Sequence, residues 1–174
     1  MNENYIFFYG HEGGDIVNPD KRCLSNFFYC PIVYMDTTFL SSEQLFMYIK
    51  ATSFGDDIAA SRIINHPSPA KCKSVGRKVL NFDVDIWDKV SYGAMYQACF
   101  AKFSQNETLR QYLLSTGNKI LVEASPYDTI WGIGTSIEEA KLMSPDSWKM
   151  RGENRLGKVL MDVRKILYDK RGKE

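Results

Sequence analysis

An acid and an amine stand seven residues apart in SSEQLFMYIK, the segment at residues 41–50. Seven residues make two turns of an α-helix, so Glu43 and Lys50 would point the same way, with Phe46 and Met47 between them. Glu43 would lie in the first turn, where the helix dipole and free backbone N–H groups keep a carboxylate ionised. Lys50 can curl its four-carbon stem toward the same place, and an amine partly removed from water beside aromatic rings is a better nucleophile. The pair could therefore serve one pocket.

Three other segments combine polar or aromatic side chains with tight local geometry. Trp87 lies in FDVDIWDKV, Asp128 and Trp131 lie in ASPYDTIWGIG, and Asn154 lies in RGENRLG. Each residue also has a plain structural explanation: Trp87 as a core aromatic, Asp128 as the cap of a turn and Asn154 as a helix N-cap. The residue types by themselves therefore suggest a pocket and name no reaction.

Several elements must position these side chains. Strands are predicted at residues 5–9, 31–35 and 119–124, because β-branched and aromatic runs there are bounded by turn-forming residues. A capping box, Ser41-x-x-Gln44, predicts where the first helix begins. Further helices are predicted at 56–65, within 70–80, at about 84–103, within 106–116 and at about 153–168. In the helix at 84–103 one face carries Ile86, Val90, Gly93, Gln97 and Phe100. Helices dominate, so we expect an α+β fold in a single domain over residues 1–174.

The totals limit the function classes. The chain has 174 residues, an apolar content of 44% and a net charge of +1, which are ordinary values for one soluble domain. No apolar run approaches a membrane span and the first residues lack the pattern of a secretory signal, so a cytoplasmic protein with no membrane partner is expected. The cysteines form no CxxC pair, which favours reduced thiols and gives no reason to expect a metal; no cofactor is expected either. Their positions are Cys23, Cys30, Cys72 and Cys99.

Common catalytic motifs are missing from the sequence. There is no GxGxxG after a strand, no GxxxxGK[ST] and no GxSxG elbow, and neither His11 nor His66 has an evident nucleophile partner. A nicotinamide oxidoreductase, a phosphate-loop enzyme and a serine hydrolase are therefore set aside.

A family resemblance covers nearly the whole chain, from about residue 5 to 167. The segments LSNF, SSEQLFMYIKA, GRKV, TLRQYLLSTGNKILVEASPYDTIWGIG and GENRLGKVLMDVR follow one another in that order. In this order they resemble the YbiA-like, or NADAR, superfamily of N-glycosidases. The resemblance implies the YbiA-like fold and hydrolysis of a bond between a ribose and a base-like nitrogen. The substrate would be a ribosylamino-pyrimidine phosphate of the riboflavin pathway or an ADP-ribosylated guanine. The alternative is a module that binds NAD or ADP-ribose without cleaving it.

The resemblance also implies roles for single residues. Catalytic groups fall on Glu43, Lys50 and Asp128, and substrate contacts fall on Asn26, Trp87, Trp131 and Asn154. Arg22 and Arg77 are candidates for a substrate phosphate, because a planar guanidinium suits phosphate oxygens.

Two positions depart from the family pattern. The family commonly has His after SSE and Gln further along that helix, where this chain has Gln44 and Met47. The loss of a histidine that could bond the substrate leaves room for a substrate other than the riboflavin intermediates. A near-neutral charge favours a small nucleotide, whereas the basic segment PAKCKSVGRK at residues 69–78 keeps a nucleic acid open as the carrier of an ADP-ribosylated guanine.

Overall fold

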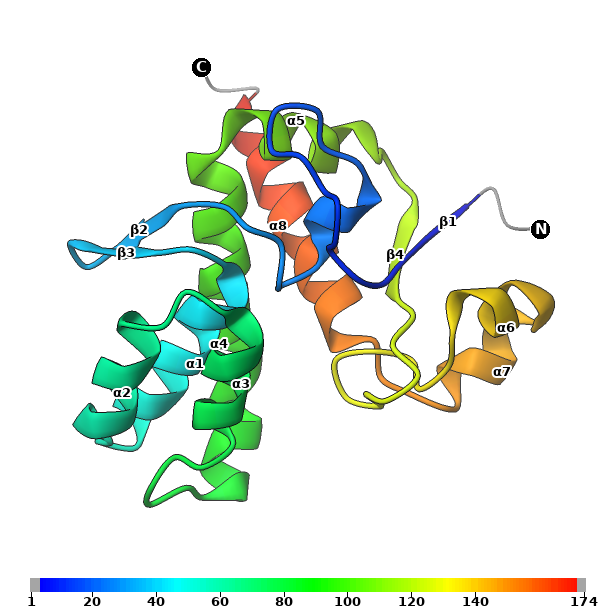
Figure 1. Ribbon diagram of the computed structural model, residues 1–174. Helices are drawn as coiled ribbons and strands as arrows, with labels where there is room; N and C mark the ends of the chain where they lie inside the picture. The colour runs from blue at the N-terminus through cyan, green and yellow to red at the C-terminus, as the bar shows by residue number, and fades with distance from the viewer. Residues whose placement is uncertain (1–3, 172–174) are drawn as a thin grey trace. The chain divides into compact units, whose positions relative to one another are not determined.

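The computed structural model describes residues 4–171, which form two compact units (Figure 1). One unit holds residues 4–25 and 108–171, and the other holds Asn26–Glu107. The first unit is thus built from two stretches of chain that the second unit separates in sequence. Eight α-helices and four short strands lie within residues 4–171, so the α+β class is confirmed. The expectation of one domain over the whole chain stays a prediction.

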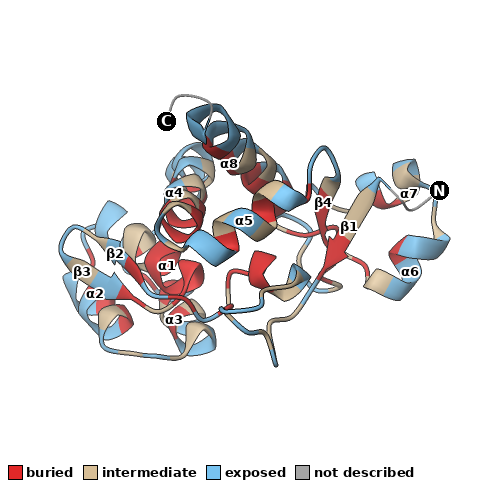
Figure 2. Cartoon of the chain, turned by 90° about the horizontal axis from the view of Figure 1, so that it is seen from above, coloured by how far each residue is buried: buried red, intermediate tan, exposed pale blue. Residues whose placement is uncertain are grey.

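Four helices and a β-hairpin make up the unit at Asn26–Glu107. They are β2 (Ile32–Tyr34), β3 (Thr37–Phe39), α1 (Ser42–Ser53), α2 (Asp57–Ile64), α3 (Pro69–Gly76) and α4 (Val84–Gln105). All three other helices pack against α1 (Figure 1), and Figure 2 shows buried residues along this helix. Each helix begins at a side-chain cap that accepts a backbone N–H, which explains why the sequence starts a helix there. The caps are Ser41, Asp56, Ser68 and Asp83.

The long helix α4 buries a face different from the one that its large apolar residues suggest. Ile86 and Val90 are exposed, so the stripe noted in the sequence faces largely away from the core. The buried positions are mostly small or polar: Ser91, Ala94, Met95, Ala98, Cys99, Ala101, Lys102 and Phe103. Small side chains let two helices approach closely, and α1 packs on α4. Apolar periodicity alone therefore did not identify the buried face of this helix.

The hairpin contains a strand that was not predicted. Ile32 pairs with Phe39, and the turn between β2 and β3 has positive φ at Met35 and Asp36. This turn lacks the Asn-Gly or Asp-Gly pair that usually marks such turns, so a hairpin could not be recognised from its residues. The side-chain amide of Gln105 accepts from the Val33 N–H and donates to the Val33 carbonyl, both at 2.8 Å, so α4 pairs with β2 as a third strand would.

The other unit is organised around a parallel pair of strands. It contains β1 (Tyr5–Phe8), a 3₁₀ turn η1 (Lys21–Leu24), β4 (Ile120–Glu123), α6 (Ile137–Leu142), α7 (Pro145–Lys149) and α8 (Arg155–Arg171); α5 (Glu107–Ser115) begins at the unit boundary. Tyr5 pairs with Ile120 and Phe8 with Glu123. The helix α8 packs on β4 and buries Leu156, Val159, Leu160, Val163 and Leu167. Their helical spacing predicts this stripe, but Ile166, which shares the spacing, is exposed.

A second apolar cluster lies on the same pair of strands. Phe7 and Val122 from the strands meet Trp148 of α7 and Ala140 of α6, and the Phe7 and Trp148 rings meet edge-on at 6.1 Å. The short helices α6 and α7 were not predicted. None of the helices within residues 4–171 is both long and apolar enough to cross a membrane.

Candidate active site

Glu43 is buried at the start of α1, with 3% of its surface exposed. Ser41 begins the helix by accepting the Gln44 N–H at 3.1 Å, and the Asn26 carbonyl accepts the Glu43 N–H at 2.9 Å. Burial, and in smaller part the negative charge of Glu43, raises the pKa of Cys72 to about 11 and that of Cys99 to about 12. A carboxylate held this deeply is available to a group that reaches into the unit, not to bulk solvent.

Asn26 is buried beside Glu43 and fixes the beginning of α1. Its Oδ1 accepts from the Ser42 hydroxyl at 3.1 Å, and its Nδ2 lies 3.1 Å from the Met95 sulfur. The side chain therefore joins α1 to α4. The contact with a substrate hydroxyl stays a prediction, because the observed bonds give Asn26 a clear part in placing Glu43.

Lys50 lies two turns along α1 with its amine against aromatic rings. Its Nζ is 4.1 Å from the centroid of the Phe82 ring and 5.5 Å from that of Trp87. Burial, and then the nearby charge of Arg77, lowers the pKa of the Lys50 amine. A lowered pKa increases the neutral, nucleophilic fraction of an amine near pH 7.

Two further aromatic residues, Phe54 and Phe46, pack against the rings of Phe82 and Trp87. Phe54, which ends α1, lies 5.3 Å from Phe82 and 6.2 Å from Trp87 between ring centroids, and Phe46 lies 5.3 Å from Trp87. Sequence reasoning missed Phe54 and Phe82. A signal for Phe82 was present: it directly precedes the helix cap Asp83, and Trp87 is the fourth residue inside the helix, which is the spacing of a hydrophobic staple.

The two arginines differ in their surroundings. Arg22 forms an ion pair with Asp20, Nη2 to Oδ2 at 2.6 Å, and donates to the Glu12 carbonyl at 3.2 Å, so its guanidinium holds the loop before η1. Arg77 is exposed at the end of α3, and no ion pair is found for it within residues 4–171. Its charge acts on Lys50. The better-placed candidate for a phosphate is therefore Arg77.

Asp128 caps a tight turn after β4. Its Oδ1 accepts the N–H groups of Ile130 at 3.0 Å and Trp131 at 2.8 Å. A Cβ at Gly132 would stand 2.9 Å from the carbonyl oxygens of Asp128 and Glu123, so this turn requires glycine there. Trp131 is half-buried. The structural explanation for Asp128 thus has direct support, and its acid–base role stays a prediction.

Asn154 precedes α8 and binds β4. Its Oδ1 accepts the Glu123 N–H and its Nδ2 donates to the Leu121 carbonyl, both at 2.9 Å. The backbone of Asn154 has φ +52°, a conformation that asparagine tolerates better than most residues. Its side chain therefore joins helix to strand and does not cap the helix, and a substrate contact stays a prediction.

Gln44 does not face the stripe that carries Glu43 and Lys50. Its Oε1 accepts the Leu40 N–H at 2.7 Å, and its Nε2 donates to the carbonyls of Ile63 and His66 at 2.8 and 2.9 Å. These bonds tie α1 to the end of α2. In this chain the side chain at position 44 thus bonds backbone groups of its own unit, and the expectation that the missing histidine changes the substrate stays a prediction.

The predicted site residues divide between the two units. Within Asn26–Glu107, α1 carries Glu43 and Lys50, α4 brings Trp87 to the lysine, and α3 brings Arg77. Asp128, Trp131, Asn154 and Arg22 belong to the other unit. What the first group can do chemically is present a buried carboxylate and a partly desolvated amine from one helix, beside aromatic rings.

The chain is similar to proteins of one family along nearly its whole length. The family model described as the NADAR domain matches residues 7–168. The chain is 44% identical over 126 residues to an N-glycosidase of Acanthamoeba polyphaga mimivirus, which is 72% of this chain and 73% of that protein. It is 28% identical over 169 residues to a riboflavin biosynthesis protein of Vibrio vulnificus, covering 96% of this chain and 40% of that one. The NMR structure of the E. coli protein YbiA matches with a TM-score of 0.78 and 29% identity, covering 100% of this chain and 90% of that one.

Proposed function

Because the chain belongs to the NADAR domain family and is a hydrolase acting on N-glycosyl bonds, we propose that it cleaves the bond between a ribose and a base-like nitrogen in a nucleotide-like substrate. The observation that carries the proposal is the pair of groups on α1. Glu43 is buried at its first turn, and the Lys50 amine lies against the rings of Phe82 and Trp87. At 1.5 Å per residue the two Cα positions are roughly 10 Å apart along one face, within reach of one sugar.

Breaking a ribosyl C–N bond builds positive charge on the anomeric carbon and the ring oxygen. A nearby carboxylate stabilises this charge, and Glu43 supplies one from a site that excludes water. The leaving nitrogen needs a proton, and Asp128 shares this acid–base work with Glu43.

Lys50 acts as the nucleophile in this proposal. Its neutral amine attacks the anomeric carbon, the bond to the base breaks, and the base leaves with the proton from the general acid. The sugar ring then opens: the bond from the anomeric carbon to the ring oxygen breaks, the amine forms an imine with that carbon, and the proton that the amine loses passes to the ring oxygen. Water adds to the imine, which restores the amine and releases the ribosyl product. Burial and the charge of Arg77, which lower the pKa of Lys50, support the first step.

The remaining residues bind substrate. Trp87 and Trp131 stack on the base or sugar, Asn26 and Asn154 hold hydroxyl groups, and Arg77, and less directly Arg22, contacts a phosphate. The exposed guanidinium of Arg77 near Lys50 supports a substrate that carries its phosphate close to the reacting carbon.

Two substrates fit this chemistry. A ribosylamino-pyrimidine phosphate is supported by the riboflavin biosynthesis relative and by the net charge of +1, which offers no general attraction to nucleic acid. An ADP-ribosylated guanine is supported by exposed cations on and beside α3, among them Lys71 and Lys78. We propose the cytoplasm as the location, since all four cysteines are free thiols.

A two-substrate assay tests the function. The protein is incubated with a ribosylamino-pyrimidine phosphate and, separately, with DNA that carries ADP-ribosylated guanine, and products are identified by mass spectrometry. Release of base from either substrate supports the proposal and names the substrate class. Depletion of ligand without product would favour the alternative, a binding module for NAD or ADP-ribose.

Borohydride trapping tests the role of Lys50. Reduction during turnover should leave a ribosyl adduct on the peptide that contains Lys50. Lys50→Ala should lose both the adduct and turnover, while the matched control Lys89→Ala, an exposed lysine of α4, should keep both. Full activity of Lys50→Ala with no adduct in the wild type would rule out the nucleophile.

A further inference from the structure

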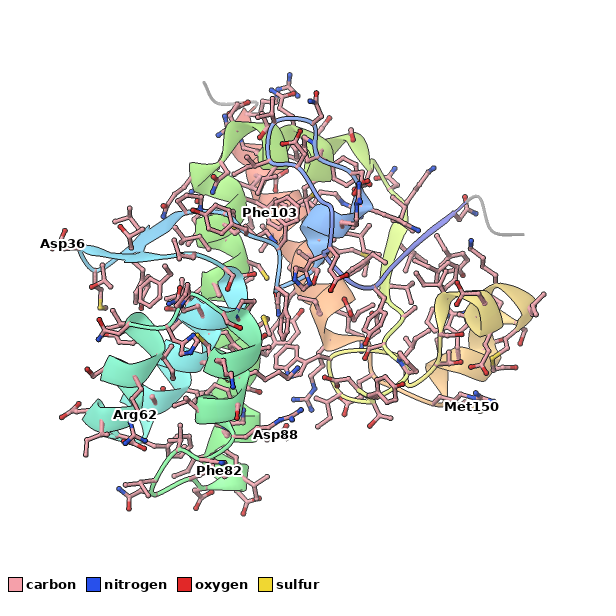
Figure 3. The ribbon with its side chains drawn as sticks, in the orientation of Figure 1. Asp36, Arg62, Phe82, Asp88, Phe103 and Met150 are labelled. Atoms are coloured by element: carbon pink, nitrogen blue, oxygen red, sulfur yellow. The ribbon has the colours of Figure 1, made fainter. Side chains whose placement is uncertain are left out.

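The loop between α3 and α4 places one aromatic ring over the lysine of α1. Phe82 lies on this loop (Figure 3), and its ring centroid is 4.1 Å from Lys50 Nζ. The ring meets Phe54 edge-on at 5.3 Å, with an angle of 61° between the planes. Yet the residue Phe82 is 43% exposed, so the ring contributes little to the core. The contact with the Lys50 amine, more than packing, distinguishes this ring from the other exposed apolar side chains.

The loop is fixed at a point two residues before Phe82. Asp56, which caps α2 by accepting the Ala59 N–H at 2.9 Å, also accepts the Leu80 N–H at 2.8 Å. Asn81 then turns the chain with φ +55°. One buried carboxylate thus sets both the start of α2 and the path of the loop that delivers the Phe82 ring.

We propose that Phe82 is a positioning residue of the enzyme, whose ring holds the Lys50 amine in place and shields it from water, so that the amine is available as a nucleophile near neutral pH. This inference rests on the proposed function of Lys50. In this inference the exposed side chain of Phe82, which lies outside α1, controls the reactivity of the Lys50 amine on α1.

The ring has two opposing effects on the amine. Its face attracts the ammonium form by a cation–π contact, which at an exposed site contributes about 0.5–1 kcal/mol. It also occupies space from which water would solvate the ammonium. Burial is the largest cause of the lowered pKa of Lys50, ahead of the charge of Arg77, and the Phe82 ring, 4.1 Å from Nζ, contributes to that burial. In this proposal the shielding effect is therefore the larger of the two.

Other charged groups around the amine do not reverse this balance. Arg77, at the end of α3, acts in the same direction as burial. Asp56 before α2 and Asp83 before α4 use their carboxylates to accept backbone N–H groups. Glu43 lies two turns back on α1. The charged group that lowers the pKa of Lys50 is therefore another cation, Arg77. The Phe82 ring can be replaced by substitution without changing any charge around the amine.

Competitive labelling without substrate measures the amine directly. Trace acetic anhydride is applied across a pH series, and mass spectrometry quantifies acetylation of the Lys50 peptide. In Phe82→Ala water can again solvate the ammonium form, which raises the pKa of the Lys50 amine. The midpoint of the labelling curve should therefore move to higher pH. Labelling at pH 7 should fall at least about threefold, the change that a rise of about half a unit in the pKa of the amine would cause. Leu80→Ala, an exposed change on the same loop, should leave the curve unchanged.

Turnover supplies the second readout. In Phe82→Ala the rise of kcat with pH should shift to higher pH while KM changes less, and Phe82→Tyr should restore the wild-type profile. Phe82→Leu serves if the alanine variant fails to fold, as judged by circular dichroism. An unchanged or lower labelling midpoint in a folded variant would overturn the proposal for Phe82. Failure of Lys50 as nucleophile would appear instead as full turnover of Lys50→Ala, so the two results are separable.

Discussion

Gly157 permits the close approach of α8 to β4, and replacing it by alanine should destabilise the protein strongly. A Cβ there would overlap the Leu121 carbonyl oxygen, and it would stand 2.5 Å from Nδ2 and 2.6 Å from Oδ1 of Asn154. Neither neighbour is a flexible chain end. Leu121 is strand backbone paired with Ile6, and the Asn154 amide is held by two hydrogen bonds to β4.

The cost follows from the bonds that must break. Making room for the methyl group displaces the side-chain amide of Asn154. Its buried partners, the Glu123 N–H and the Leu121 carbonyl, then lose their hydrogen bonds to that amide. An unsatisfied buried group costs about 1–3 kcal/mol, so two such groups cost about 2–6 kcal/mol. That is a large share of the roughly 5–15 kcal/mol by which a domain is stable.

Urea denaturation, followed by circular dichroism and by tryptophan fluorescence, measures the change in the free energy of unfolding. Gly93→Ala is the matched control, because Gly93 lies inside α4 with open space around its Cβ position. It should stabilise by about 0.5–1 kcal/mol, as alanine does in a helix interior. A double variant, Asn154→Ala with Gly157→Ala, should cost less than the sum of the two single changes, since both remove the same bonds. A loss below about 1 kcal/mol in Gly157→Ala would refute the reasoning.

Three further outcomes are expected. Gly76→Ala should lower the free energy of unfolding by about 1 kcal/mol, less than Gly157→Ala, because a Cβ would overlap the sulfur of Met47, whose flexible side chain can shift. A urea midpoint equal to that of the wild type would contradict this. The thiols of Cys72 and Cys99 should resist a thiol reagent at pH 7 and react once the chain is unfolded, since burial raises the pKa of the first to about 11 and of the second to about 12; rapid native-state labelling of either would show the burial to be wrong. Asp56→Asn should destabilise at pH 7, and the difference from the wild type should shrink as pH falls below about 4, the ordinary aspartate pKa. Backbone hydrogen bonds lower the pKa of Asp56 in the folded state, so its stabilisation is present above the unfolded pKa and is lost as pH falls through the folded one; a difference constant from pH 7 to 3 would count against it.

Sequence signals located the elements well where the cause is local. Ser41 was expected to open a helix and does so through its hydroxyl, and the strands β1 and β4 were expected from their composition. The strand β3 was missed, and the buried face of α4 was not assigned. Both depend on non-local packing: β3 needs Met35 and Asp36 in unusual backbone conformations, and α4 buries small residues because α1 lies against them.

The candidate site shows the same division. Helical spacing was sufficient to put Glu43 and Lys50 on one face, because that geometry lies within a single element. The ring that touches Lys50 most closely, Phe82, comes from a loop thirty-two positions further along, and its placement depends on Asp56. The bonds of Gln44 to the end of α2 could not be foreseen either, since its expected partner was its own helix start.

The pairing of β1 with β4 has a consequence for the order in which the chain can fold during synthesis. Tyr5 leaves the ribosome before its partner Ile120, and the whole of Asn26–Glu107 is synthesised between them. That intervening segment contains the contacts of its own compact unit, so it can condense first and bring the ends of the interrupted unit nearer, which shortens the loop that β1 and β4 must close. Until β4 is synthesised, the apolar side chains Phe7 and Phe8 lack the strand against which they pair. A nascent chain stalled before residue 120 would therefore expose them and would be the form that most needs a chaperone.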